Sequence, residues 1–262
     1  MQVNCKHRIP VDLTFRRPFV LHMDSLKLIL LASLMVTSGI SVIAADRPAD
    51  TLYYIDSKTW QIRSLADHST EKIVLLTIDD GPKAYTTPGF LSLLDQYNAK
   101  ALFFINGYLA EPLPWVVQQI LDHGHMIGNH SWSHKRLTEI SKDETKNEIV
   151  RLNNWLWEEL SYEPLFFRAP YGMMTPEATA VLNDNGMHGM GWSVNSYDWR
   201  YPDNEETIRA DAAEIAERTL QSMDGGNIIL MHDRAVSLAA LEIILEELTD
   251  RGYRFVLPSY SY

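Results

Sequence analysis

Residues Ile73–Pro82 read IVLLTIDDGP, and the remainder of the chain is best understood around them. The mostly apolar run Ile73–Ile78 has the length and composition of a strand buried in a parallel sheet. Two adjacent carboxylates, Asp79 and Asp80, end this run, and Gly81-Pro82 then turns the chain. Like charges this close raise one another's pKa unless a cation or a hydrogen-bond donor relieves them. A strand end followed by an Asx-type turn is the simpler interpretation, so the other motifs must decide between structure and chemistry.

Strand-like and helix-like segments alternate from this run to the C-terminus. The predicted strands are Ile73–Ile78, Ala101–Ile105, His125–Gly128, Leu165–Arg168, His188–Val194, Asn227–Met231 and Tyr253–Leu257. The predicted helices are Pro88–Tyr97, Leu113–His123, Lys142–Glu159, Pro176–Asn185, Glu205–Met223 and Ser237–Thr249. Such alternation implies parallel strands with helices outside them, and about seven units suit a barrel better than a doubly wound sheet. We therefore expect an α/β fold, a (β/α) barrel, over residues 72–262, after a polar lead-in segment, 46–71, interpreted as a hairpin.

The composition indicates a globular chain and excludes some partners. Of the 262 residues, 46% are hydrophobic and 22% are charged, which is ordinary for a folded domain. The net charge of −11 argues against nucleic acid, because a phosphate-binding surface needs a basic face. The same charge argues against an anionic membrane surface. It is compatible with a neutral polymer or an N-acetylated sugar.

The N-terminal segment, residues 1–45, resembles a targeting sequence. The uncharged run Leu28–Ala45 ends in small residues, which predicts a signal peptide cleaved after Ala44 or Ala45. We then expect an exported chain, periplasmic or secreted, without stable membrane association. The alternative is an uncleaved anchor, because the 18 uncharged residues are at the lower limit for spanning a bilayer.

Two residues qualify this N-terminal segment. Met23 would be a more ordinary start than residue 1, and a start there would leave the first 22 residues untranslated. Cys5 is the single cysteine of the chain, and it lies in the removable segment. The mature protein would therefore have neither a disulfide nor a thiol nucleophile.

A histidine pair provides candidate metal ligands. In GNHSWSH, residues 128–134, His130 and His134 are four residues apart, a spacing that would place both imidazoles on one side of a helical turn. With nine histidines in the chain, such a pair alone is weak evidence, and two surface histidines are the simpler interpretation. Asp80 adds a carboxylate from a preceding strand end. Two histidines and one carboxylate leave positions free for water and substrate, as in catalytic zinc sites, and would also accept cobalt or another divalent ion.

Two further side chains are candidates for proton transfer. Asp79, beside the proposed ligand Asp80, could accept a proton from a metal-bound water as general base. The charge of the metal would also relieve the conflict between the two carboxylates. His232, in ILMHD at the end of a predicted strand, is a candidate general acid, although a histidine at a strand end is more often structural. Asp233 beside it is interpreted either as a surface residue or as a partner.

Two more motifs follow predicted strands. In RAPYG, residues 168–172, Arg168 could hold a carboxylate with two hydrogen bonds, and the turn could offer a backbone N–H to an oxyanion. An arginine that only bridges two loops would fit this motif equally well. In SVNSYDW, residues 193–199, Asp198 is the predicted partner of that arginine, and Trp199 offers an apolar wall.

TIDDGP, HSWSH, RAPYG, SYDW and LMH, in this order and at successive strand ends, resemble the five motifs of the NodB-type polysaccharide deacetylases, carbohydrate esterase family 4. The resemblance extends from about Lys72 to the C-terminus. It implies a deformed (β/α) barrel, the NodB homology domain. It also implies a metal-dependent hydrolase that removes acetyl groups from sugars of the N-acetylglucosamine type, so that the partner is an N-acetylated glycan.

The resemblance also implies a role for each matching residue. Asp79 matches the catalytic base and His232 the catalytic acid. The residues that match the metal ligands, with zinc as the expected ion and cobalt as an alternative, are Asp80, His130 and His134.

The residues that match the substrate groove come from three motifs. Arg168 and Asp198 match a pair that lines the groove and tunes the base. Tyr171 matches the residue whose backbone N–H completes the oxyanion site. Leu230 and Trp199 match the apolar pocket around the acetyl methyl group.

Two positions depart from the family pattern. Ile78 replaces a usual Phe within an apolar run, a change that should be tolerated. Asn195 replaces a common Asp, which removes a negative charge near the rim and is expected to weaken the hold on Arg168 or to alter substrate choice. Neither change removes a ligand or a proton-transfer group.

Three functions remain open at this point. The first is a de-N-acetylase of peptidoglycan or a chitin-like glycan. The second is an O-deacetylase of acetylated xylan, which would use the same residues. The third is an inactive glycan-binding protein, which would lack a ligand, the acid or the base. All of these residues are present, so the sequence favours an enzyme.

Overall fold

The computed structural model describes residues 52–261, with side chains up to residue 259. The predicted signal peptide, Cys5 and Met23 lie outside the described residues, as does the beginning of the lead-in segment. Within the described part of the chain, no helix has the length and apolarity needed to cross a bilayer.

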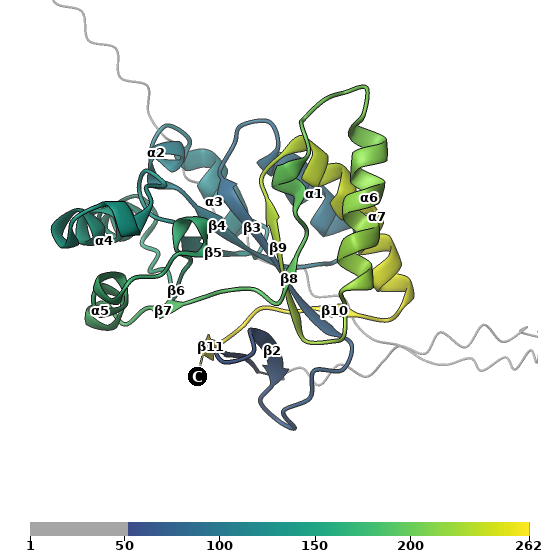
Figure 1. The fold of residues 1–262 in the computed structure, drawn as a ribbon, viewed down its shortest axis with the longest axis horizontal. Helices are drawn as coiled ribbons and strands as arrows, with labels where there is room; N and C mark the ends of the chain where they lie inside the picture. Colours follow the sequence, from purple (N-terminus) through teal and green to yellow (C-terminus); the bar gives the residue numbers. More distant parts are fainter. Residues whose placement is uncertain (1–51, 262) are drawn as a thin grey trace, which may run out of the picture. The chain divides into compact units, whose positions relative to one another are not determined.

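The described residues form one curled, mainly parallel sheet with helices packed outside it (Figure 1). Its neighbouring parallel strands are, in order, β9 (Asn227–His232), β3 (Ile73–Gly81), β4 (Ala101–Ile105), β5 (Met126–Asn129), β6 (Phe166–Phe167) and β7 (His188–Gly189). The organising run lies at the centre of the sheet, in β3. Side chains of β3 point alternately to the helices outside and to the interior of the curl, which is why the run is continuously apolar.

One stretch of chain closes the curl. The strand predicted at His188–Val194 is two short segments, β7 and β8 (Val194–Asn195). β7 pairs with β6 at one end of the series, whereas β8 pairs in parallel with β9 at the other. The sheet therefore closes into a deformed barrel with a seam at residues 190–193, which confirms the predicted fold class.

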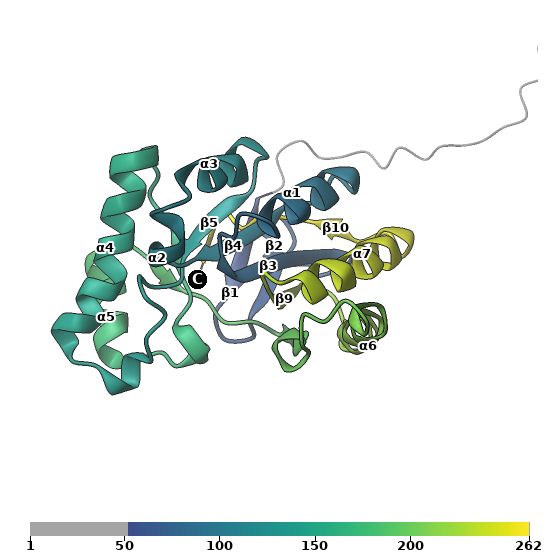
Figure 2. The same ribbon diagram turned by 90° about the horizontal axis from the view of Figure 1, so that it is seen from above.

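Helices cover the outside of the sheet, with α4 and α5 at one end and α6 and α7 at the other (Figure 2). Their bounds are α1 (Thr87–Gln96), α2 (Gly107–Ala110), α3 (Pro114–Asp122), α4 (Lys142–Leu160), α5 (Pro176–Asp184), α6 (Ile208–Gln221) and α7 (Ala235–Asp250). All six predicted helices are present; the short α2 was not predicted. Local signals explain two of the starts. Ser141 and Glu144 form a capping box at α4, and the Thr175 hydroxyl caps α5 before Pro176.

The lead-in segment contains the predicted hairpin. Strands β1 (Tyr53–Asp56) and β2 (Gln61–Ser64) pair antiparallel, and β2 pairs with β9 through Gln61 and Asn227. Two short C-terminal strands complete this end of the sheet: β10 (Arg254–Phe255) pairs with β3, and β11 (Tyr260–Ser261) pairs with β1.

Candidate active site

The sequence motifs meet at one rim, because the carboxyl ends of neighbouring parallel strands lie together. Residues that end or follow β3, β5, β6 and β9 line a single cavity of about 700 Å³ there. Its predicted members are Asp79, Asp80, His130, His134, Tyr171, Trp199, Leu230 and His232. Arg168 and Asp198 are buried behind this surface, so the structure brings all ten predicted site residues into one region.

Three of these residues form a cluster suited to a metal ion. One ligand atom from each of Asp80, His130 and His134 lies within 4.8 Å of the others. Asp80 Oδ1 is 3.4 Å from His130 Nε2 and 3.2 Å from His134 Nε2. This oxygen is buried and accepts no hydrogen bond from any residue that the structure describes. Two imidazole nitrogens and an unpartnered carboxylate oxygen fit a divalent cation such as zinc or cobalt.

The ionisation of the cluster also suits a cation. Burial alone would raise the pKa of Asp80, but the adjacent imidazoles of His130 and His134 outweigh it and lower that pKa. Burial, together with the nearby His130, lowers the pKa of His134. His130 Nδ1 lies 2.8 Å from the carbonyl oxygen of Arg168 and must donate its proton there, which leaves Nε2 free as a ligand atom. The lowered pKa of Asp80 favours its carboxylate form and the lowered pKa of His134 favours its neutral imidazole, the forms that bind a metal ion.

The prediction that the histidine pair lies on a helical turn is wrong. Residues 130–136 form an irregular segment, with left-handed backbone at Ser131 (φ 69°) and at His134 (φ 56°). The Ser131 hydroxyl accepts a hydrogen bond from the backbone N–H of His134 at 3.0 Å and stabilises this bend. The two rings still converge, with centroids 4.9 Å apart, because the bend rather than a helix brings them together.

Arg168 holds Asp79. The Asp79 side chain is almost fully buried, and its Oδ1 accepts a hydrogen bond from Arg168 Nη1 at 2.7 Å. The same guanidinium donates to Thr77 Oγ1 and to the carbonyl oxygens of Met190 and Gly191. These carbonyls belong to the seam between β7 and β8, where the strand is broken. Arg168 therefore joins the seam of the barrel to the end of β3 and fixes one oxygen of Asp79.

The predicted pairing of Arg168 with Asp198 is wrong, because Asp198 pairs with His232. Asp198 Oδ1 is 2.7 Å from His232 Nδ1, and Oδ2 accepts from the His232 backbone N–H at 2.7 Å and from Ser237 Oγ at 2.5 Å. The physical reason is the register of the sheet: Asp198 follows β8, which lies beside β9, whereas Arg168 follows β6 on the other side of the seam.

This pairing affects the acidity of the histidine. Burial alone would lower the pKa of His232, but the hydrogen bond and negative charge of Asp198 outweigh it and raise that pKa. With Nδ1 held by the carboxylate, Nε2 is the nitrogen left for the cavity. The imidazole of His232 and the carboxylate of Asp79, each paired with a buried charged residue, therefore line the same cavity as the candidate metal ligands. Such groups can give and take up a proton.

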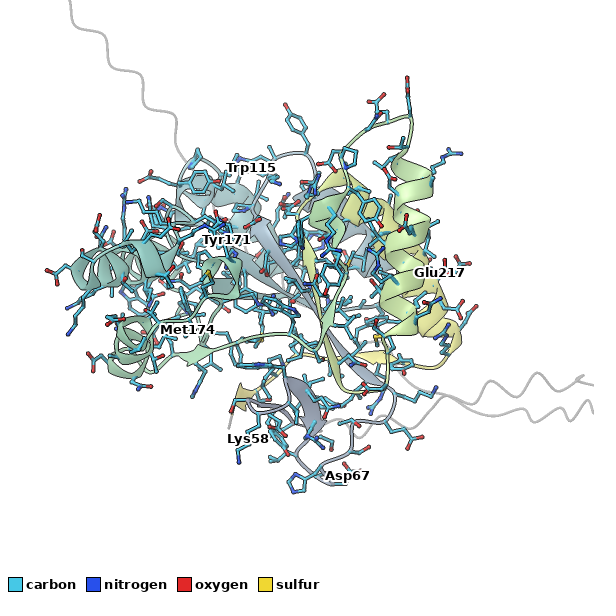
Figure 3. All side chains as sticks on the ribbon, in the orientation of Figure 1. Lys58, Asp67, Trp115, Tyr171, Met174 and Glu217 are labelled. Atoms are coloured by element: carbon cyan, nitrogen blue, oxygen red, sulfur yellow. The ribbon has the colours of Figure 1, made fainter. Side chains whose placement is uncertain are left out.

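The remaining predicted residues form the walls of the cavity. Tyr171, labelled in Figure 3, lies in a short turn with left-handed backbone (φ 59°), and the residue is 52% exposed. Trp199 is likewise 52% exposed, whereas Leu230 on β9 is buried. Asn195 also lines the cavity, but its side chain accepts a hydrogen bond from the Tyr197 N–H at 2.9 Å. It is not among the hydrogen-bond partners of Arg168 in the described chain, so the expected effect on that arginine has no structural basis.

Asp233 is not a surface residue. Its side chain is fully buried and accepts hydrogen bonds from the hydroxyls of Thr86 and Thr87. Its backbone N–H donates to the Asp79 carbonyl at 2.7 Å, and its carbonyl accepts from Lys83 Nζ. The sequence placed Asp233 next to His232 but gave no sign of the threonines. Asp233 ties the end of β9 to the loop that follows Asp79 and Asp80.

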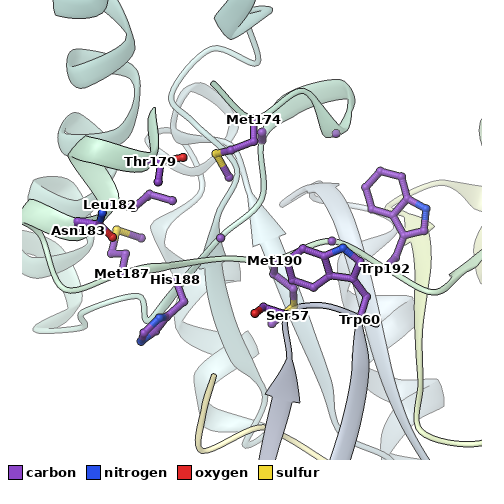
Figure 4. Close-up of a pocket in the computed structure, with 14 residues that line it drawn as sticks. Ser57, Trp60, Met174, Thr179, Leu182, Asn183, Met187, His188, Met190 and Trp192 are labelled. Carbon is purple, nitrogen blue, oxygen red and sulfur yellow. The ribbon is translucent and has the colours of Figure 1, made fainter. Parts of the chain in front are cut away.

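A second cavity, of about 510 Å³, adjoins the first. Both are lined by Ala169, Gly172 and Trp192. Figure 4 shows Met174 on the side of the second cavity that faces α5. The same view shows Trp60, which belongs to the hairpin, near Trp192. The hairpin therefore contributes to the surface next to the first cavity.

Known proteins resemble this chain in sequence and in structure. A family model described as polysaccharide deacetylase matches residues 66–190. The chain is 34% identical over 207 residues to a peptidoglycan-N-acetylglucosamine deacetylase of Bacillus cereus, a match that covers 77% of this chain and 91% of that protein. It is 35% identical over 194 residues to the peptidoglycan-N-acetylglucosamine deacetylase PgdA of Listeria monocytogenes, covering 74% of this chain but 39% of that longer protein.

A solved structure of the peptidoglycan deacetylase PdaC from Bacillus subtilis superimposes with a TM-score of 0.64 at 30% identity, covering 72% of this chain and 87% of that structure. The chain belongs to the polysaccharide deacetylase family, the NodB-type enzymes of carbohydrate esterase family 4.

Proposed function

We propose that this protein is an exported, metal-dependent hydrolase that removes N-acetyl groups from a glycan containing N-acetylglucosamine, with peptidoglycan as the substrate class. The observation that carries the proposal is the convergence of Asp80, His130 and His134 within 4.8 Å, in a cavity that also holds Asp79 and His232. The predicted signal peptide and the names of the relatives support export and a cell-wall substrate.

Asp80, His130 and His134 would hold the metal. When bound, a divalent ion such as Zn²⁺ polarises the amide carbonyl and lowers the pKa of water at the site. The protein supplies the remaining chemistry, which we assign as follows.

Asp79 is the general base. Its Oδ1 is held by Arg168, so the negative charge of the carboxylate is stabilised and its orientation is fixed. Its Oδ2 lies 3.7 Å from His130 Nε2 and faces the metal-binding cluster, where it can take the proton of the attacking water. The backbone N–H of Tyr171 stabilises the oxygen of the acetyl group as negative charge develops on it.

His232 is the general acid. Asp198 stabilises its protonated form, so that Nε2 carries the proton that the departing amine requires. Leu230 and Trp199 line the same cavity and provide an apolar surface for the acetyl methyl group. The proton taken by Asp79 and the proton given by His232 balance the hydrolysis of one amide bond to an amine and acetic acid, which then ionises to acetate.

The experiment is acetate release by the purified protein from N-acetylglucosamine oligomers, peptidoglycan and acetylated xylan, each with added Zn²⁺ and with a chelator. Chelator-sensitive release from the first two, and little from xylan, is the expected result. Release mainly from acetylated xylan would instead indicate an O-deacetylase. Zinc binding without release, or no zinc binding, would favour a glycan-binding protein.

A further inference from the structure

The cavity of about 700 Å³ that holds the proposed catalytic residues is called the catalytic-site cavity. Two arginines line it, Arg136 and Arg234. The guanidinium of Arg234 donates to the carboxylate of Asp203 and to the carbonyl oxygens of Asp198 and Tyr201. Its donors are therefore committed to holding the loops of the rim.

Arg136 differs from Arg234 in its partners. Its Nη1 contacts Met173 Sδ at 3.8 Å, and its Nε lies 3.8 Å from the carboxylate of Glu139, an exposed neighbour. No oxygen of the described chain accepts a hydrogen bond from Arg136 at 3.5 Å or less. An exposed pair at 3.8 Å is weak, so most of the five N–H donors of this guanidinium remain available to a ligand.

The position of Arg136 relative to the metal-binding cluster is fixed by stacking. The Arg136 guanidinium carbon is 3.9 Å from the centre of the Tyr171 ring, and that ring is 4.7 Å from the ring of His134. Tyr171 itself is held by its left-handed turn. The cation is therefore held against the wall of the cavity one aromatic ring away from a metal ligand, where the stacking limits its motion.

We propose that Arg136 forms a carboxylate-binding subsite, and that the preferred glycan carries a carboxylate close to the acetamido group that is hydrolysed. This inference rests on the proposed deacetylase function and names its substrate more closely. A planar guanidinium binds a carboxylate with two parallel hydrogen bonds, which a neutral sugar cannot match.

Peptidoglycan offers this carboxylate from two sources. In a muramic acid unit, a lactyl group that ends in a carboxyl group is joined by an ether oxygen to the ring carbon next to the one that carries the acetamido group. In glycan strands without peptides this carboxyl group is free and charged. In peptide-bearing strands it is an amide, and the nearest carboxylates belong to the stem peptide. A chitin-like oligomer has neither.

The test compares kcat/KM for acetate release on three substrates: N-acetylglucosamine tetramer, peptide-free peptidoglycan strands and peptide-bearing fragments. The measured quantity is the kcat/KM for each carboxylated substrate divided by the kcat/KM for the neutral tetramer. In Arg136→Gln this ratio should fall about tenfold, mainly through KM, for the substrate whose carboxylate is bound. A fall for peptide-free strands assigns the lactyl group, and a fall only for peptide-bearing fragments assigns the peptide.

Arg151→Gln is the matched control. Arg151 is also exposed, is stacked on the Trp132 ring at 3.6 Å and is paired with Glu111 at 3.6 Å, but it does not line the catalytic-site cavity. In Arg151→Gln, both kcat/KM ratios should equal the wild-type ratios. Ratios in Arg136→Gln that equal the wild-type ratios on both carboxylated substrates would overturn the proposal, even if the variant were slower on every glycan.

A binding measurement separates this inference from the deacetylase proposal. Calorimetric titration of the zinc-loaded protein with the same three glycans requires no turnover. Tighter binding of a carboxylated glycan by the wild type than by Arg136→Gln, by about tenfold, supports the subsite even if no acetate is released. Equal affinities of the two proteins for all three glycans would refute it.

Discussion

Replacing Asp198 by asparagine should impair the proposed acid while leaving the fold in place. Asp198 uses both oxygens as acceptors, from His232 Nδ1 at 2.7 Å and from the His232 N–H and Ser237 Oγ. Asparagine has one acceptor oxygen and one NH₂ donor, so it cannot accept on both sides. Losing a buried hydrogen bond to a charged group costs about 1.5–3 kcal/mol. In Asp198→Asn, the protonated form of His232 therefore loses that stabilisation.

The consequence for catalysis has a defined sign. In the wild type, Asp198 raises the pKa of His232, and the proposed acid works in its protonated form. In Asp198→Asn the pKa of His232 falls, so the basic limb of the kcat/KM profile should move to lower pH. By analogy with the carboxylate of a Ser-His-Asp triad, the fall in rate should be about 10²–10⁴-fold.

The assay is acetate release between acidic and mildly alkaline pH, with zinc content measured on the same samples. Ser237→Ala is the matched control, because it removes one donor to Asp198 without changing its charge, and it should shift the limb little. An unchanged basic limb in Asp198→Asn, with full zinc content, would refute the assignment of His232 as the acid.

Three further substitutions test other parts of the site. Asp79→Asn should retain zinc and lose nearly all activity, because only the base is removed; full activity with bound zinc, in a combined metal and acetate assay, would exclude Asp79 as the base. His134→Ala should lose both zinc and activity, since it deletes one of three ligands, and zinc analysis after gel filtration provides the check. Asp233→Ala should destabilise the protein by about 2–4 kcal/mol, because the hydroxyls of Thr86 and Thr87 lose a buried acceptor. Calorimetry should then show Tm lower by about 4–16 °C; an unchanged Tm would contradict the anchoring role of Asp233.

Local sequence signals predicted the regular part of the fold. The run around Leu75 and Leu76 indicated a fully buried strand, and the structure has that strand at the centre of the sheet. The helix beginning at Pro176 was marked by Thr175, whose hydroxyl caps it. In these segments the side-chain pattern and the capping residues carry the information themselves.

The pairings within the site required the register of the sheet. Nothing in the sequence shows that the strand near Met190 is broken, because the break is stabilised by Arg168, which is 22 residues away. The same closure places Asp198 beside His232 rather than beside Arg168. Such contacts depend on which strands lie side by side, and no local pattern records that.

The bend that joins the two histidines was missed for a related reason. A spacing of four residues is compatible with a helical turn, but the left-handed backbone of Ser131 and His134 gives the same convergence without a helix. The sequence therefore predicted that the two histidines lie together, but it did not predict the backbone conformation that brings them together.

The most direct test is whether zinc held by Asp80, His130 and His134 controls acetate release from peptidoglycan. The purified protein would be stripped with a chelator, and acetate release would be followed as Zn²⁺ is added back. Activity should vanish on stripping and return with about one zinc ion per chain, and His134→Ala should regain neither metal nor activity. Undiminished release by the metal-free protein, or full activity of His134→Ala, would contradict a metal-dependent hydrolase at this site.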